Sequence, residues 1–102
     1  MGIDARLQDE RGAVIRELLD PKSLVPRLLP EHNNASTVCL RFVDRYGDTM
    51  FNQVQIPVLL EELRAAVRSC LHPEARAHGE ALVSLVAAGL DHVHTYVLLI
   101  GD

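Results

Sequence analysis

The stretch from Thr37 to Leu71 constrains the fold more than any other part of the chain. Residues 37–43 alternate in polarity, and residues 49–56 resume that alternation after a polar connection. Side chains of a strand point to opposite faces in turn, so the pattern predicts a β-hairpin with one buried side. Asp44 and Gly47 supply the residues that a hairpin turn prefers. The sequence therefore predicts two paired strands around that turn.

The same alternation assigns each side chain of this hairpin to a face. The register predicts that the core side carries Val38, Leu40, Phe42, Met50, Val54 and Ile56. It predicts that the outer side carries Cys39, Arg41, Val43, Phe51, Gln53 and Gln55. Asn52 falls on the core side, so we expect either a bulge that re-aims it or a hydrogen-bonded burial.

Two amphipathic helices are predicted after the hairpin. Pro57 suits the first turn of a helix, where its missing N–H costs nothing. Apolar residues then recur at spacings of three and four, which forms one stripe made of Leu60, Leu63, Val67, Cys70 and Leu71. Pro73 can begin the second helix, which contains Gly79 as a weak point where a break is allowed.

The N-terminal third predicts another hairpin and then an ordered loop. Ile3, Ala5 and Leu7 alternate with polar residues, and the turn Asp-Glu-Arg-Gly at 9–12 leads to a partner strand over residues 13–19. Residues 20–36 hold three prolines, which exclude a long helix or a central strand. This segment also contains several leucines, so we expect a loop that packs along the core, with one short helical turn, as a candidate site.

The C-terminal residues 93–100 form the most continuous apolar run and predict an interior strand. Val93, Val97 and Leu99 would lie on one face, and the other face would also be apolar. The predicted order is ββββααβ. This is an α+β fold with two β-hairpins and a C-terminal strand in a mostly antiparallel sheet, and with two helices on one face. We expect residues 1–102 to form one domain.

Charge and composition narrow the class of protein. The net charge is −4 and the apolar fraction is 48%, so we expect a globular protein and no direct contact with a nucleic-acid backbone. No apolar stretch is long enough to predict a membrane span, and the N-terminus shows no signal-peptide pattern. Cys39 and Cys70 lie in apolar contexts, so we expect buried free thiols, over a disulfide or a nucleophile, and a cytoplasmic location.

Asp91-His92-Val93-His94 is the most site-like cluster in the chain. If these residues are extended, the imidazoles of His92 and His94 share a face at a spacing that can chelate a transition metal. A third ligand would have to come from His32, His72 or His78 through tertiary proximity. A small metal-dependent enzyme or metal-binding protein is therefore the alternative functional hypothesis.

The leading hypothesis is a non-enzymatic interaction protein that needs no cofactor. The outer sheet face combines an aromatic residue with arginine and amides, which is typical of an interface. The candidate binding residues are Arg41, Tyr46, Phe51, Gln53 and Gln55. We expect a protein partner or a second copy in a homodimer, with Phe51 as the anchor. An inhibitor or immunity-type protein directed against a basic partner would fit the size and acidity, by analogy alone.

Overall fold

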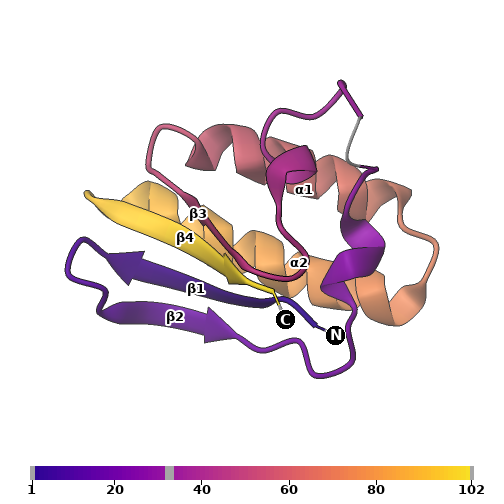
Figure 1. The fold of residues 1–102 in the computed structure, drawn as a ribbon, viewed down its shortest axis with the longest axis horizontal. Helices are drawn as coiled ribbons and strands as arrows, with labels where there is room; N and C mark the ends of the chain where they lie inside the picture. The colour runs from indigo at the N-terminus through magenta and orange to yellow at the C-terminus, as the bar shows by residue number, and fades with distance from the viewer. Residues whose placement is uncertain (1, 32–33, 102) are drawn as a thin grey trace.

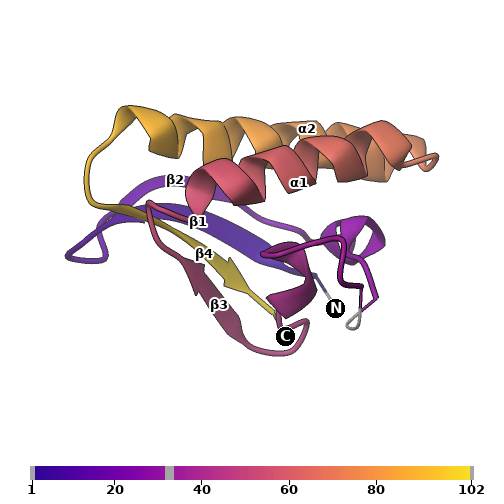
Figure 2. The same cartoon turned by 90° about the horizontal axis from the view of Figure 1, so that it is seen from above.

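Two layers make up the structure, a four-stranded sheet and a pair of helices that cover one of its faces (Figure 1 and Figure 2). The computed structural model describes residues 2–31 and 34–101. The strands are β1 (Asp4–Asp9), β2 (Val14–Leu18), β3 (Asp48–Phe51) and β4 (Thr95–Ile100), and the helices are α1 (Ile56–Ser69) and α2 (Pro73–Ala88). The predicted α+β class, with helices on one face of an antiparallel sheet, is confirmed.

The strand order is β2-β1-β4-β3, and every neighbouring pair is antiparallel. The first and last strands of the chain are therefore neighbours at the centre of the sheet. The predicted interior position of the C-terminal strand is confirmed, although the strand begins at Thr95. Its side chains alternate as expected: Thr95, Val97 and Leu99 are buried under the helices.

The first hairpin forms as its turn residues predict. The Asp9 carboxylate accepts hydrogen bonds from the backbone N–H groups of Arg11 and Ala13, both at 2.9 Å. Gly12 takes a φ of 84°, which glycine adopts without strain. The following loop contains one short 3-10 helix, η1 (Val25–Leu28), in agreement with the single helical turn expected there.

The strand predicted over residues 37–43 is wrong. This segment is a loop with a single 3-10 turn, η2 (Leu40–Phe42). The Glu62 carboxylate on α1 accepts hydrogen bonds from the backbone N–H groups of Val38, Cys39 and Leu40, at 2.6, 3.0 and 2.9 Å. These N–H groups are bound to a side chain, so they are not available for a strand ladder.

The predicted facing of β3 is also wrong. Phe51 is only 3% exposed, whereas Met50 is 52% exposed. Because the 37–43 strand is missing, β3 pairs only with β4, and Phe51 lies opposite Val97, which faces the helices. Partners in an antiparallel pair share a face, so Phe51 enters the core and Met50 leaves it. Asn52 lies beyond β3, where its side chain accepts the N–H groups of Val54 and Gln55 in the turn before α1.

Both predicted prolines lie in the first turn of a helix, since α1 begins at Ile56, just before Pro57, and α2 begins at Pro73; α2 continues through Gly79 without a break. A Cβ atom at Gly79 would lie 2.7 Å from a methyl group of Val67 and 2.9 Å from one of Leu28. The glycine therefore permits close contact of α2 with α1 and η1, which offsets its poor helix propensity. The predicted apolar stripe of α1 ends at Val67, because Leu71 lies beyond the helix and is 94% exposed.

The core lies between the sheet and the helix pair. Its large, fully buried side chains come from both layers and include Ile3, Leu7, Ile56, Leu59, Leu63, Leu82, Val97 and Leu99. Among the described residues, no helix has the length and apolar character needed to cross a membrane.

Candidate functional site

No element of residues 2–31 and 34–101 covers the side of the sheet that faces away from the helices, and we name this side the open face (Figure 2). Its strand partners form three rows across the sheet. One row runs Asp48, Ile100, Asp4; the central row runs Met50, Leu98, Arg6, Glu17; the third runs Tyr96, Gln8, Val14. The open face therefore has an apolar stripe along β4, bordered by charged and polar side chains.

Charge is distributed unevenly on the open face. Arg6 Nε lies 2.8 Å from Glu17 Oε2, so the central row is internally neutralised. Asp4 and Asp48 flank Ile100 from the two neighbouring strands, and neither has a cationic partner among the described residues. Asp4 Oδ1 accepts a hydrogen bond from the backbone N–H of Asp20 at 2.7 Å. One end of the open face is therefore acidic.

Two of the predicted binding residues, Arg41 and Tyr46, lie on the segment that leads into β3. The Arg41 guanidinium lies 4.8 Å from the ring centroid of Phe42, a cation–π contact. Tyr46 is 78% exposed, and Phe42 is exposed as well. The segment thus presents two aromatic rings to solvent. The strand register predicted Phe42 in the core. Because this segment is a loop and not a strand, its side chain is exposed instead.

The other three predicted binding residues have different environments. Phe51 belongs to the core and is not available to a partner as an outer-face anchor. Gln53 holds two loops together: its Nε2 donates to the backbone oxygen of His92 at 2.5 Å, and its Oε1 accepts the N–H of His94 at 2.6 Å. Gln55 is exposed, and its Oε1 accepts the N–H of Asn52 at 2.9 Å. The predicted binding role of Phe51 on the outer face is therefore wrong, and those of Gln53 and Gln55 remain predictions.

His92 and His94 are exposed in the loop before β4. The extended conformation on which the metal hypothesis depended is absent at His94, which has a φ of 57°. In residues 2–31 and 34–101, no group of three His, Cys, Asp or Glu side chains is arranged to hold a metal ion. His32, one of the three candidate third ligands, lies outside the described residues. Metal binding here remains a hypothesis.

Both cysteines are free thiols. Cys39 is buried, and burial raises the pKa of its thiol, with a smaller contribution from the negative charge of Glu62. A raised pKa disfavours the thiolate, so Cys39 is poorly suited to act as a nucleophile. Cys70 is half-buried, which departs from the burial expected for it.

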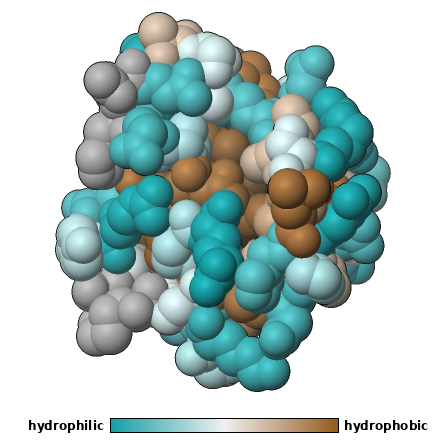
Figure 3. Space-filling model, turned by 90° about the vertical axis from the view of Figure 1, so that its right-hand side faces the viewer, coloured by the Kyte–Doolittle hydropathy of each residue, from teal (hydrophilic) through white to brown (hydrophobic). Residues whose placement is uncertain are grey.

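A groove of mixed lining lies at the end of the molecule where the loop of residues 20–36 packs against α1. Figure 3 shows this end, with apolar side chains recessed between hydrophilic ones. The groove has a volume of about 410 Å³, and its lining combines apolar residues such as Leu28 and Leu40 with polar ones such as Arg27 and Glu62. The loop predicted as a candidate site therefore forms one wall of a concave surface. The lining of the groove does not indicate a ligand class.

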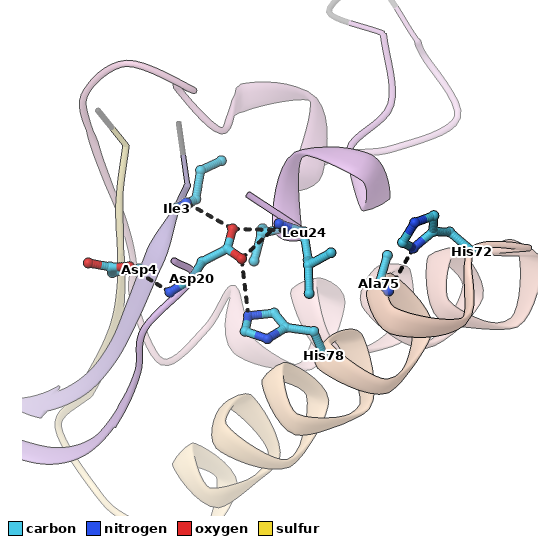
Figure 4. Close-up of polar contacts among 8 residues, drawn as sticks. Ile3, Asp4, Asp20, Leu24, His72, Ala75 and His78 are labelled. Atoms are coloured by element: carbon cyan, nitrogen blue, oxygen red, sulfur yellow. Dashed lines mark hydrogen bonds and ion pairs between the residues drawn. The ribbon is translucent and has the colours of Figure 1, made fainter. Parts of the chain in front are cut away.

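One buried carboxylate with several hydrogen bonds was not predicted from the sequence. Asp20 is buried, and its carboxylate accepts the backbone N–H groups of Ile3, Leu24 and Val25 at 3.1, 2.8 and 2.9 Å (Figure 4). Asp20 Oδ1 also lies 3.6 Å from His78 Nε2 on α2. An Asp before a short helical turn is a local signal for the bonds to Leu24 and Val25. The contacts with Ile3 and His78 have no local signal.

Asp20 and His78 also line a pocket of about 500 Å³ between the first hairpin and α2. An acid beside an imidazole can orient a general base. The Asp20 oxygens are already occupied by backbone N–H groups, which indicates a structural role. We therefore assign this pair to the stability of the fold.

The open face and the exposed segment before β3 are thus two surfaces available for recognition, whereas the buried Asp20 carboxylate supports the fold. Comparison with known proteins found no family model, no curated protein and no solved structure that matches the chain.

Proposed function

We propose that this chain is a protein-interaction module whose open face binds a second copy of itself. The observation that carries the proposal is the apolar stripe of Tyr96, Leu98 and Ile100, which continues onto exposed Met50. No helix or strand of the described part of the chain covers this stripe (Figure 2). A contiguous apolar patch of this kind is typical of an interaction surface. Arg6 and Glu17 beside it provide a neutral, polar border.

Charge selects one way of stacking two open faces. A two-fold axis along the strands would bring Asp4 and Asp48 of both copies to the same level, which places like charges together. A two-fold axis across the strands places Ile100 over the partner's Tyr96, and Asp4 level with the partner's Gln8. The central row then faces its own counterpart, residue by residue. Leu98 meets Leu98, and Met50 meets Met50. Arg6 and Glu17 also face their counterparts, but their internal ion pair leaves this row without net charge, whereas Asp4 and Asp48 have no such neutralisation. The second arrangement is self-complementary, as a two-fold interface requires, and it stacks the sheets as in a β-sandwich.

The area of the open face limits the strength of association. Four strands about 4.8 Å apart, each with about six residues at about 3.3 Å, cover on the order of 400 Å² per copy. Stable interfaces bury about 800 Å² per partner. We therefore expect a transient dimer, with a dissociation constant on the order of 100 μM.

An inhibitor or immunity-type role toward a basic protein is the second candidate function. It is favoured by the row in which Asp4 and Asp48 flank Ile100, because an apolar residue between two carboxylates suits a partner with a basic border. Both candidates are non-enzymatic and use the same face. The two free thiols support a reducing compartment, and we place the protein in the cytoplasm.

Analytical ultracentrifugation over a concentration series tests the self-association. The unmodified chain is expected to show a reversible monomer–dimer equilibrium. Met50→Asp and Met50→Lys should each be monomeric, because each places like charges opposite one another. An equimolar mixture of the two variants should form the dimer again, because Asp then faces Lys.

Leu71→Asp is the matched control, since Leu71 is more exposed than Met50 and follows the C-terminal end of α1, in the helix layer and not in the sheet. It should leave the equilibrium unchanged. A chain that stays monomeric at millimolar concentration contradicts self-association. If Leu71→Asp weakens association as much as Met50→Asp does, the interaction is non-specific and the open face is not the interface.

A further inference from the structure

Three arginines line one small groove between the two helices. Arg64 and Arg68 come from α1, and Arg76 comes from α2. The groove has a volume of about 210 Å³, and Val67, Val83 and Glu80 complete its lining. The arginines are exposed and belong to the helix layer, so the groove is separate from the open face of the sheet (Figure 2).

These arginines have no ionic partner within the described part of the chain. The ion pairs formed by Arg and Lys side chains there are Arg6–Glu17 and Lys22–Glu74. Arg76 and Glu80 are four residues apart on α2, a spacing that often pairs, but they form no ion pair. The groove therefore concentrates three positive charges against one negative charge, in a chain whose net charge is −4.

This concentration of charge is unfavourable for the fold by itself. Arg64 and Arg68 lie four residues apart on one helix face, where like charges repel. The third guanidinium adds to this repulsion from the neighbouring helix. A bound anion would remove the repulsion, and planar guanidinium groups match the oxygens of phosphate with paired hydrogen bonds.

We propose that this groove binds the phosphate group of a small phosphomonoester. The volume of about 210 Å³ suits one phosphate group with a short organic part. Val67 and Val83 supply an apolar wall for that part. Arg64, Arg68 and Arg76 hold the dianion, and Glu80 limits the affinity because its carboxylate repels it. The proposal is independent of self-association through the sheet.

Amide chemical-shift titration of the full ¹⁵N-labelled chain tests the site. Inorganic phosphate and phosphoserine are the probes, and sodium chloride at equal ionic strength controls for charge screening. Both probes should shift the amides of residues 64–68 and 76–80 in a saturable way, with a dissociation constant of about 1 mM for inorganic phosphate. Tighter binding of phosphoserine assigns the site to esters, whereas equal binding overturns the organic part of the proposal.

Three variants separate a binding site from general basicity. Arg68→Gln should weaken phosphate binding about tenfold, because it removes a charge-assisted contact. Glu80→Gln should strengthen binding several-fold. Arg11→Gln, which removes an exposed arginine from the β1–β2 turn, should leave it unchanged. Circular dichroism spectra of the three variants and the unmodified chain verify that each variant is folded.

Glu80→Gln should strengthen phosphate binding, whereas Arg68→Gln should weaken it. This difference in sign is the sharpest criterion, because a purely structural role of the cluster does not predict tighter phosphate binding. The proposal is overturned if phosphate shifts are no larger than those from chloride, or if Arg11→Gln and Arg68→Gln have equal effects. Unchanged binding in Glu80→Gln also overturns the assignment of the anion to this groove.

Discussion

Asp20 Oδ1 lies 3.6 Å from His78 Nε2 in the interior of the protein, and this contact connects the end of the first hairpin to α2. The Asp20 side chain is fully buried, and its oxygens accept three backbone N–H groups from the N-terminal strand region and the start of η1 (Figure 4). One carboxylate therefore joins three segments that are far apart in the sequence.

Replacing Asp20 should be among the most destabilising changes in the chain. Asp20→Ala leaves three backbone N–H groups without their acceptor, so the free energy of unfolding should fall by about 3–5 kcal/mol. Asp20→Asn keeps one acceptor oxygen and should cost less. Asp9→Ala is the matched control, because Asp9 also accepts two backbone N–H groups but lies in an exposed turn. Its cost should stay below about 1 kcal/mol in urea denaturation. Equal losses for Asp20→Ala and Asp9→Ala would mean that burial of the carboxylate contributes nothing.

Leu63 should be indispensable for the packing of α1. Its side chain is almost fully buried in the core cluster that also contains Leu40. Leu63→Ala should lower the free energy of unfolding by about 2–5 kcal/mol, because it leaves a cavity. The exposed Leu71→Ala should change it by less than about 0.5 kcal/mol. A denaturation midpoint that is unchanged in Leu63→Ala would refute the position of α1 on the sheet.

Gln53 should determine the order of the loop before β4. Its amide contacts both His92 and His94, so Gln53→Ala should cost about 1–2 kcal/mol and speed hydrogen exchange at the His94 amide. Gln53→Glu keeps the acceptor for His94 but loses the donor to His92. It should therefore protect the His94 amide better than Gln53→Ala does. Identical exchange in the unmodified chain and Gln53→Ala would show that the loop is held by other contacts.

Cys39 should react slowly in the native state and make stability fall at alkaline pH. Burial, and then Glu62, raises the pKa of the thiol above its value in the unfolded chain. The stability that the protonated thiol contributes is fully present below the unfolded pKa. It is lost as the pH rises through the folded pKa, because the unfolded chain releases its proton first.

Two measurements check this behaviour. Native Cys39 should be alkylated more slowly than half-buried Cys70, and both should react quickly after unfolding. Urea denaturation at increasing alkaline pH should show a smaller loss of stability in Cys39→Ala than in the unmodified chain. Fast alkylation of native Cys39 would contradict its burial.

Local signals in the sequence predicted most of the regular structure. The Asp9–Gly12 turn, the prolines in the first helical turns and the three-and-four spacing of α1 act over a few residues, so they can be recognised in the sequence without knowledge of the fold. The apolar character of β4 likewise predicted a central strand.

Long-range contacts determined the parts of the structure that local sequence signals did not predict. Residues 37–43 alternate like a strand, but Glu62, more than twenty positions away, binds their N–H groups and makes a loop. The pairing of β3 with β4 alone then turned Phe51 into the core and Met50 out. Alternation reveals that two faces differ, whereas the neighbouring strand determines which face is covered. The composition of the open face, and the binding residues predicted for it, therefore depended on pairings that only the tertiary structure contains.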